Sequence, residues 1–322
     1  MRKNFLLKTL LLGFIMGVFS CGTKNSEEKS KLIIFHAGSL SVPFQEIAEA
    51  FMKENPNIEV VMESAGSRQC ARKITDLEKE CDIMASADYK VIDNLLIPEH
   101  ADWNIKFASN EMALVFHEQS RYSDEITIEN WYKILLKEDV AFGRSDPNSD
   151  PCGYRAILTI KLAEMYYQNQ SFAEELLAKD NNYIRPKETD LLGLLESNAI
   201  DYIFLYRSVA EQHGLDYLLF SDSINLKNPI YADFYAKATT EITGEKPGET
   251  MTKKGEAMVY GVTIIKDSPN EENAIKFVEF LLNNDKGMQV MVNKGQPSVI
   301  PAYSETYDMV PEELKKYVKN KK

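Results

Sequence analysis

The stretch "KLIIFHAGSLSVPFQEIAEAFMKENPNIEVVMESAGS", residues 31–67, predicts the fold of this protein. Leu32–Phe35 has the pattern of a buried strand, and a turn of small residues follows it. A helix comes next, and a second strand, Ile58–Met62, ends in another small-residue turn. The apolar positions at helical spacing are Phe44, Ile47, Ala48 and Phe51. A third strand is expected around Ile83–Ala85. Strands that alternate with helices indicate a parallel α/β layer.

The two small-residue turns, His36–Ser39 and Ser64–Ser67, are the first candidates for a binding site. Both follow strands, and ligands of parallel α/β sheets bind at the carboxyl ends of the strands. A serine hydroxyl in such a turn either caps the next helix or donates to a bound oxyanion. Ser39 and Ser67 are therefore candidate oxyanion ligands. The basic residues that follow Ser67 are interpreted as a solvated helix face.

The rest of the chain predicts a second lobe. Residues 110–118 form an apolar strand that leads into a new segment, and Tyr202–Tyr206 forms another strand, followed by a helix that Gly214 stops. The apolar residues 255–265 are interpreted as the return crossing. Two crossings between two α/β lobes predict a hinged clamp around a central ligand cleft. The expected boundaries are 32–110 plus 262–322 for lobe one and 111–261 for lobe two.

Residues 1–20 have the form of a secretory signal peptide. A basic start is followed by an apolar run too short for a membrane-spanning helix, and small residues then surround a cysteine. Cys21 is expected to be the lipidated first residue of a lipoprotein, and residues 21–31 a flexible tether. The alternative is an ordinary signal peptide with an incidental cysteine. The expected location is the periplasm or the cell surface.

Composition and missing motifs argue against several classes of function. The formal net charge of −12 does not suit nucleic-acid binding, which needs clustered Lys and Arg. The sequence lacks the ligand pairs of a zinc site, a serine-hydrolase elbow, a P-loop and a dinucleotide fingerprint. No cofactor is expected. Outside the cytoplasm Cys70 and Cys81 could form a disulfide, although an odd number of cysteines would leave a thiol free.

The stretch "DPNSDPCGYRA", residues 146–156, predicts the start of a helix. Asp150 fits the N-cap position and Pro151 the first turn. The Cys152 N–H would then be a free donor at the positive end of the helix dipole, where anions bind. Yet Asp146 and Asp150 place carboxylates where that anion would sit. Simple capping by both acids would explain the pattern without a ligand.

Four motifs together resemble one family. "FHAGSLSVPF" (35–44), "ESAGS" (63–67), "DPNSDPCGYRA" (146–156) and "DYIFLYRSVAEQHG" (201–214) are similar to the substrate-binding lipoproteins of tungstate/molybdate ABC importers, of the kind typical of archaea. The resemblance covers about residues 32–300. It implies the two-lobed clamp of the type II periplasmic binding proteins. It also implies a monomeric receptor that captures molybdate or tungstate for an ABC permease and performs no chemistry.

The resemblance also implies a set of oxyanion ligands. They are the hydroxyls of Ser39 and Ser67, the backbone N–H groups of Cys152 and Leu205, and the hydroxyl of Tyr231, for which Tyr260 is the rival candidate. Molybdate and tungstate have nearly the same size and charge, so the sequence does not distinguish between them.

In several members of this family a carboxylate near the helix start becomes a ligand of the metal itself. Molybdenum and tungsten can bind more than four oxygens, whereas sulfur does not readily do so. Asp150 is the first candidate for such a ligand and Asp146 the second. The carboxylate would repel sulfate and phosphate and so select the metal oxyanions. Members with six-coordinate metal carry a glutamate where this chain has Leu205. We therefore expect a tetrahedral or five-coordinate anion.

Three alternatives remain from the sequence. The protein could be a receptor for another oxyanion, such as sulfate or phosphate. It could also be a secreted hydrolase, which would need two carboxylates facing each other about 5–10 Å apart. A lipoprotein that scaffolds partners is the third alternative, and a ligand site enclosed between two lobes would argue against it.

Overall fold

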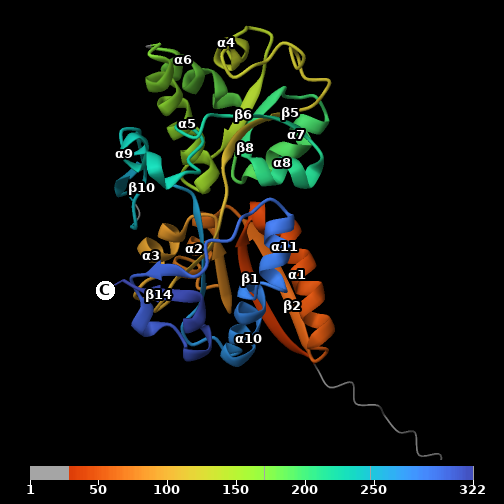
Figure 1. The fold of residues 1–322 in the computed structure, drawn as a ribbon, viewed down its shortest axis with the longest axis vertical. Helices are drawn as coiled ribbons and strands as arrows, with labels where there is room; N and C mark the ends of the chain where they lie inside the picture. Colours follow the sequence, from red (N-terminus) through yellow and green to blue (C-terminus); the bar gives the residue numbers. More distant parts are fainter. Residues whose placement is uncertain (1–28, 170, 247, 322) are drawn as a thin grey trace, which may run out of the picture.

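The computed structural model describes residues 29–169, 171–246 and 248–321, which form two α/β lobes stacked along the long axis of the molecule (Figure 1). Each lobe is built on a five-stranded sheet. The chain crosses from lobe one to lobe two near residue 110 and returns after residue 254. The two-lobed clamp predicted from the sequence is therefore confirmed.

The sheet of lobe one has the strand order β2-β1-β3-β12-β4. β1 runs parallel to β2 and β3, whereas β12 is antiparallel to both β3 and β4. The strands are β1 (Ser30–Ala37), β2 (Ile58–Ala65), β3 (Ile83–Ser86), β4 (Ile105–Ser109) and β12 (Val259–Ile264). The helices are α1 (Ser41–Glu54), α2 (Ser67–Thr75), α3 (Tyr89–Leu95), α10 (Glu271–Leu282) and α11 (Gly287–Asn293). A small parallel pair, β13 (Ala302–Ser304) and β14 (Val318–Asn320), completes this lobe.

The sheet of lobe two has the order β7-β6-β8-β5-β9. Its strands are β5 (Met112–Phe116), β6 (Phe142–Ser145), β7 (Ile184–Arg185), β8 (Tyr202–Tyr206) and β9 (Asp216–Leu219). Its helices are α4 (Trp131–Leu135), α5 (Pro151–Tyr167), α6 (Phe172–Lys179), α7 (Leu192–Glu196), α8 (Arg207–His213) and α9 (Ala232–Tyr235). A separate antiparallel hairpin, β10 (Thr239–Thr243) and β11 (Thr250–Lys254), lies beside the junction of the lobes in Figure 1.

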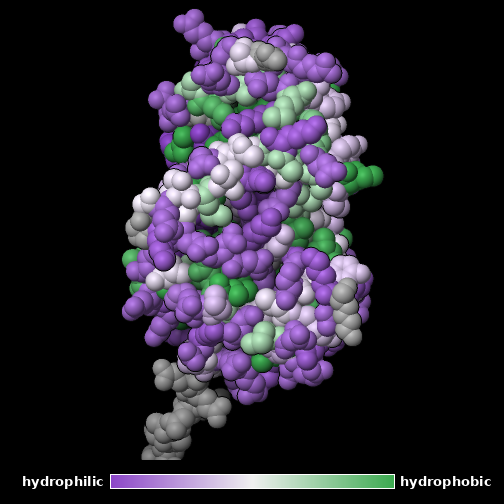
Figure 2. All heavy atoms as spheres, turned by 90° about the vertical axis from the view of Figure 1, so that its left-hand side faces the viewer, coloured by the Kyte–Doolittle hydropathy of each residue, from purple (hydrophilic) through white to green (hydrophobic). Residues whose placement is uncertain are grey.

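Aromatic side chains fill the core of each lobe. In lobe one, Phe51 of α1 packs edge-on against Phe277 of α10, with ring centroids 5.1 Å apart. In lobe two, Trp131 packs edge-on against Phe220 at 5.2 Å. Such pairs add to the stabilisation that burial of the rings already provides. The face that carries α9 and the hairpin is mostly hydrophilic, with apolar side chains in small scattered groups (Figure 2).

The structure confirms most elements expected from the sequence and corrects three details. The expected strand Tyr202–Tyr206 is β8, and Gly214, with φ of +65°, ends α8. The sheet of lobe one is mixed rather than parallel, because β12 returns from lobe two and enters it in the opposite direction. β12 starts at Val259, so lobe one resumes before residue 262. The chain enters β1 at Ser30, inside the predicted tether.

The predicted signal peptide and Cys21 lie outside the described residues. Among the residues that are described, no helix combines the length and the apolar character required to span a membrane. Cys70 and Cys81 are buried free thiols in this structure, so the disulfide that the sequence left open is absent from it. Burial raises the pKa of Cys70 to about 12, which makes it a poor nucleophile at neutral pH.

Candidate functional site

The two candidate serines lie at the carboxyl ends of β1 and β2, as the sequence indicates. Ser39 sits in a 3-10 turn, Gly38–Leu40, and Ser67 is the first residue of α2; both are buried. The Ser39 hydroxyl shares a hydrogen bond of 2.9 Å with the Tyr260 hydroxyl. The Ser67 hydroxyl accepts a hydrogen bond of 2.9 Å from the Ala87 N–H. An accepting hydroxyl keeps its own proton for a further partner, so Ser67 can also donate to a ligand.

The lobes are closed on each other at this point. The Gln69 N–H of lobe one donates to the Ser149 carbonyl of lobe two at 3.1 Å. Arg68 is also buried, and its Nε donates to the Asn148 carbonyl at 3.1 Å. The interpretation of this basic segment as a solvated face is therefore wrong for Arg68. Its environment comes from the second lobe, and helical spacing carries no information about that lobe.

Asp150 is the N-cap of α5, as predicted, and each of its carboxylate oxygens accepts from one backbone N–H. Oδ1 accepts from the Cys152 N–H at 3.1 Å, and Oδ2 accepts from the Glu188 N–H at 2.9 Å. The Cys152 N–H is therefore occupied by Asp150 in this structure and is not a free donor. Each carboxylate oxygen carries two lone pairs, so both oxygens of Asp150 can still take a second partner.

Asp146 has a local role. Its Oδ1 accepts from the Asn148 N–H at 3.0 Å, and its Oδ2 accepts from the Ser149 hydroxyl at 2.9 Å. Asp146 thus holds the turn that precedes α5. This geometry matches the capping alternative and does not support Asp146 as a metal ligand.

Glu188 is a site residue that the sequence did not reveal. It is completely buried, and among the described residues neither of its carboxylate oxygens has a hydrogen-bond partner. A Cβ added to Gly38 of lobe one would lie 2.7 and 2.8 Å from the two Glu188 oxygens, so the carboxylate faces the lobe that carries Ser39. In the sequence, Glu188 within "RPKETDLL" (185–192) looks like an ordinary acidic residue in the first turn of a helix.

Asp150 and Glu188 form a buried pair of like-charged groups. Burial raises the pKa of both carboxyl groups above their ordinary values, and the Asp150 carboxylate raises the pKa of Glu188 further. Both residues belong to lobe two and lie next to each other, since Asp150 holds the backbone of Glu188. A buried pair without a cation between its members is costly and needs a partner to offset that cost.

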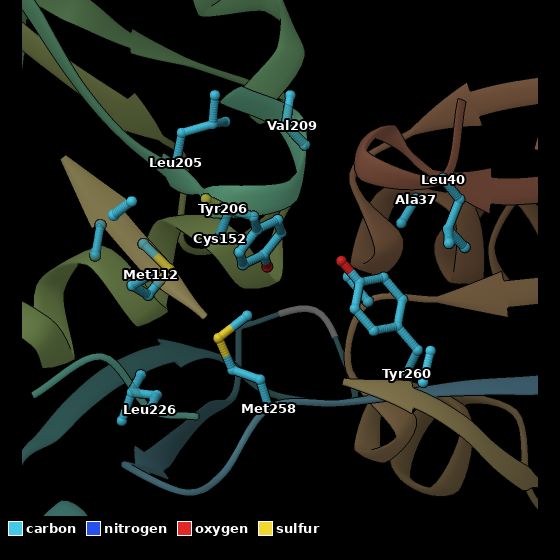
Figure 3. Packing of buried hydrophobic residues seen from close by; sticks show 14 of the residues in the cluster. Ala37, Leu40, Met112, Cys152, Leu205, Tyr206, Val209, Leu226, Met258 and Tyr260 are labelled. Atoms are coloured by element: carbon cyan, nitrogen blue, oxygen red, sulfur yellow. The ribbon is translucent and has the colours of Figure 1, made fainter. Parts of the chain in front are cut away.

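Two tyrosine hydroxyls lie between the lobes, one from each side (Figure 3). The rings of Tyr206 in β8 and Tyr260 in β12 have centroids 6.5 Å apart. The Tyr206 hydroxyl accepts a hydrogen bond of 2.9 Å from Arg155 Nη1, which leaves its proton free to be donated. The side chain of Leu205, the preceding residue of the strand, points the other way into the core of lobe two. The predicted role of the Leu205 N–H stays a prediction.

The structure does not place Tyr231, the predicted tyrosine ligand, at the interface, whereas its rival Tyr260 lies there. Tyr231 is 37% exposed, and its ring packs beside Tyr235 on the outside of lobe two. Tyr260 is fully buried and also accepts from Asn110 Nδ2 at 2.9 Å. Both tyrosines follow apolar residues in the sequence, and only the return of β12 into lobe one decides which of them faces Ser39.

His36 makes the protein less stable in acid. It is buried at the end of β1, and burial lowers its pKa to about 4 from its ordinary value of 6.5. Below pH 6.5 the unfolded chain therefore binds a proton that the folded protein does not bind. The free energy of unfolding falls as the pH falls from 6.5 towards 4. We expect wild type to lose about 2 kcal/mol more than His36→Gln between pH 7 and pH 5. Urea unfolding of both proteins at the two pH values measures this, and equal losses would contradict it.

The sequence profile of the bacterial extracellular solute-binding proteins matches residues 32–295, which is most of the chain. The chain belongs to this family. Its members are solute-binding proteins rather than enzymes, and their extracellular location agrees with the location expected from the N-terminus.

Relatives at 42–48% identity cover nearly the whole chain. A solute-binding protein of Petrotoga mobilis is 48% identical over 95% of this chain and 96% of its own length. The molybdate/tungstate-binding protein WtpA of Thermococcus kodakarensis is 42% identical over 98% of this chain and 96% of its own. WtpA of Pyrococcus abyssi is also 42% identical and matches over 100% of both chains.

Solved structures share the fold. The periplasmic molybdate-binding protein of Azotobacter vinelandii superposes with a TM-score of 0.59 at 15% identity, over 82% of this chain and 98% of its own. The sulfate-binding protein SubI of Mycobacterium tuberculosis gives 0.58 at 13% identity, over 84% and 87%. At these identities the superpositions show the fold alone. It is the type II periplasmic binding protein fold that the sequence predicts.

Proposed function

We propose that this protein binds molybdate or tungstate between its two lobes and delivers it to the permease of an ABC importer. The observation that carries the proposal is the buried pair Asp150 and Glu188, set among neutral donors at the lobe interface. The names of the two WtpA relatives support the same ligand. The donors would be the hydroxyls of Ser39, Ser67 and Tyr206, without a salt bridge to the anion.

The carboxylate pair favours a metal oxyanion over sulfate. Sulfur does not readily accept further oxygen ligands, so a sulfate dianion gains no bond to this pair and is repelled by the negative charge that the pair carries. Molybdenum and tungsten can bond to those same oxygens, which turns the repulsion into ligation. Asp150 and Glu188 together would complete six oxygens around the metal. The expectation of a tetrahedral or five-coordinate anion rested on Leu205, which stands where six-coordinate members carry a glutamate. Glu188 would supply that second carboxylate from another position, so the reason for the expectation no longer holds.

The alternatives from the sequence receive less support. A receptor for sulfate or phosphate would have to hold its anion against the buried Glu188 carboxyl group, which forms no well-aligned hydrogen bond with the described residues. A hydrolase needs two carboxylates on opposite sides of its substrate. Asp150 and Glu188 instead adjoin each other on lobe two and cannot flank a bond.

The cellular setting of the proposal comes from the N-terminus. Lipidation of Cys21 would hold the protein at the outer side of the cytoplasmic membrane or in the periplasm, with residues 21–31 as a tether. The receptor would act as a monomer that meets only its anion and the permease. Mass spectrometry of the membrane-extracted protein tests the lipid on Cys21.

The proposed function is tested by calorimetric titration of the soluble domain, without the signal peptide and Cys21. Tungstate, molybdate, sulfate and phosphate are titrated one at a time. Tight binding of the first two, with no heat from the others, is the expected result. Sulfate binding of comparable strength would show that the carboxylates do not select the ligand, and no binding by any of the four would refute the proposal.

The two serines should each contribute to affinity. We expect Ser39→Ala and Ser67→Ala to weaken tungstate binding by about 1–3 kcal/mol each, the usual cost of leaving a buried polar partner unsatisfied. Ser123→Ala is the control, since that hydroxyl donates only to the nearby Glu118 carbonyl. Calorimetry of the three variants measures the differences. Wild-type affinity in both site variants would remove these serines from the anion site.

A further inference from the structure

We propose that four buried residues form a latch that holds the lobes closed and so slows the release of the bound anion. They are Asp88 of lobe one, Tyr154 and Arg155 of α5, and Lys253 of β11; these four are called the latch below. All four are at least nine-tenths buried. The inference rests on the proposed function, because it concerns an anion enclosed between the lobes.

Asp88 is the lobe-one half of the latch. It is the N-cap of α3, where its Oδ1 accepts from the Lys90 N–H at 3.0 Å. Its Oδ2 accepts from Lys253 Nζ at 2.6 Å and from the Tyr154 hydroxyl. Capping therefore fixes one carboxylate oxygen within lobe one. The other oxygen, Oδ2, binds residues outside lobe one.

Arg155 links the latch to the anion site. Its Nη1 donates both to the Ala87 carbonyl of lobe one at 2.8 Å and to the Tyr206 hydroxyl at 2.9 Å. The Ala87 N–H in turn donates to the Ser67 hydroxyl. Arg155 Nη1 thus contacts Tyr206, a candidate anion donor of lobe two. It also contacts Ala87, whose N–H binds Ser67, a candidate donor of lobe one. When the lobes close, the same contacts hold both hydroxyls in place.

The β10–β11 hairpin brings Lys253 to the latch and is itself attached to lobe one. Arg68 and Arg72 of α2 donate to the carbonyls of Thr243 and Gly244 near the hairpin tip, at 2.5 and 2.7 Å. Lys253 lies close to the other end of the hairpin. The hairpin is therefore bound to lobe one at two places, and it is bound to α5 of lobe two where Lys161 Nζ donates to the Thr239 carbonyl at 2.6 Å, so it bridges the two lobes.

These contacts join residues of the two lobes, so we expect opening of the lobes to break them, and this decides the step that they affect. An anion enters an open clamp, before Tyr154 and Asp88 meet. Removing a latch contact should leave the association rate nearly unchanged. Loss of one partner of a buried, charge-assisted contact instead raises the dissociation rate.

The test compares Tyr154→Phe with wild type and with Tyr202→Phe. Tyr202 is a matched control, because it is fully buried in β8 and its hydroxyl donates to the Arg121 carbonyl inside lobe two. Protein loaded with tungstate is mixed with excess molybdate, and the tungsten that stays with the protein is measured over time. Thermal unfolding of each variant is recorded in parallel.

We expect tungsten to leave Tyr154→Phe about tenfold faster than wild type, and to leave Tyr202→Phe at the wild-type rate. A similar loss of thermal stability in both variants would make the difference specific to the latch. An unchanged release rate in Tyr154→Phe, or equal acceleration in both, would overturn the proposal. Should Tyr154→Phe fail to fold, Lys253→Gln replaces it under the same criteria. If wild type binds neither anion, the proposed function itself fails.

Discussion

Glu188→Gln should lower the affinity for tungstate about a hundredfold and yet make the ligand-free protein more stable at pH 7. Glutamine keeps the shape of the side chain but is a weak metal ligand, so one of the two carboxylates proposed to bind the metal is lost. The affinity loss corresponds to about 3 kcal/mol, the usual size of a hydrogen-bonded or ligated charge in a buried site. Calorimetry with tungstate, molybdate and sulfate measures it.

The gain in stability follows from the pKa of Glu188. Burial and the Asp150 carboxylate raise that pKa above its ordinary value of 4.5, so the folded protein holds this proton more tightly than the unfolded chain does. The free energy of unfolding of wild type therefore falls as the pH rises above 4.5. Glutamine does not titrate. The advantage of the variant should be largest at neutral pH and shrink as the pH is lowered.

Glu196→Gln is the matched control, since Glu196 is exposed at the end of the nearby helix α7. It should leave the affinity for tungstate at the wild-type value. Wild-type tungstate affinity in Glu188→Gln would contradict the proposed role of this residue. A loss of stability at pH 7 would instead show that the carboxylate has a partner within the folded protein.

Gly66→Ala should block closure of the lobes while leaving each lobe folded. Gly66 has φ of −58°, which alanine adopts freely, so the substitution causes no backbone strain. The added Cβ would collide with the Ser149 carbonyl group of lobe two and lie 3.0 Å from Asp150 Cβ. Backbone atoms of a capped turn cannot easily move away. We expect tungstate affinity to fall about 10- to 100-fold, the effect of about 1–3 kcal/mol of overpacking.

Two measurements separate this effect from misfolding. Gly193→Ala is the control, because a Cβ at Gly193 meets no atom within 4 Å. The unfolding temperature of ligand-free Gly66→Ala should stay close to that of wild type, whereas small-angle scattering should show that compaction needs about 10- to 100-fold more tungstate than in wild type. Compaction and affinity equal to those of wild type would mean that the closed arrangement described here is not the ligand-bound one.

The sequence by itself determined the parts of this protein that depend on neighbours along the chain. Strands β1, β2 and β8 follow from short apolar runs, and α1 follows from its apolar periodicity. The turns that carry Ser39 and Ser67, and the N-cap at Asp150, follow from residue types at adjacent positions. Local conformational preference and hydrophobic burial act within a few residues, and a pattern in the sequence records them directly.

Only the tertiary structure decided which distant residues meet. Glu188 lies beside Asp150, far away in the sequence, because the Glu188 N–H donates to the Asp150 carboxylate that caps α5. Tyr260 replaces Tyr231 because β12 returns into the sheet of lobe one. Asp88 and Arg68 belong to lobe one, and both are buried against residues outside that lobe. Such contacts depend on how two lobes close around each other. That arrangement arises from surfaces assembled out of many segments, and the periodicity of any one segment does not encode it.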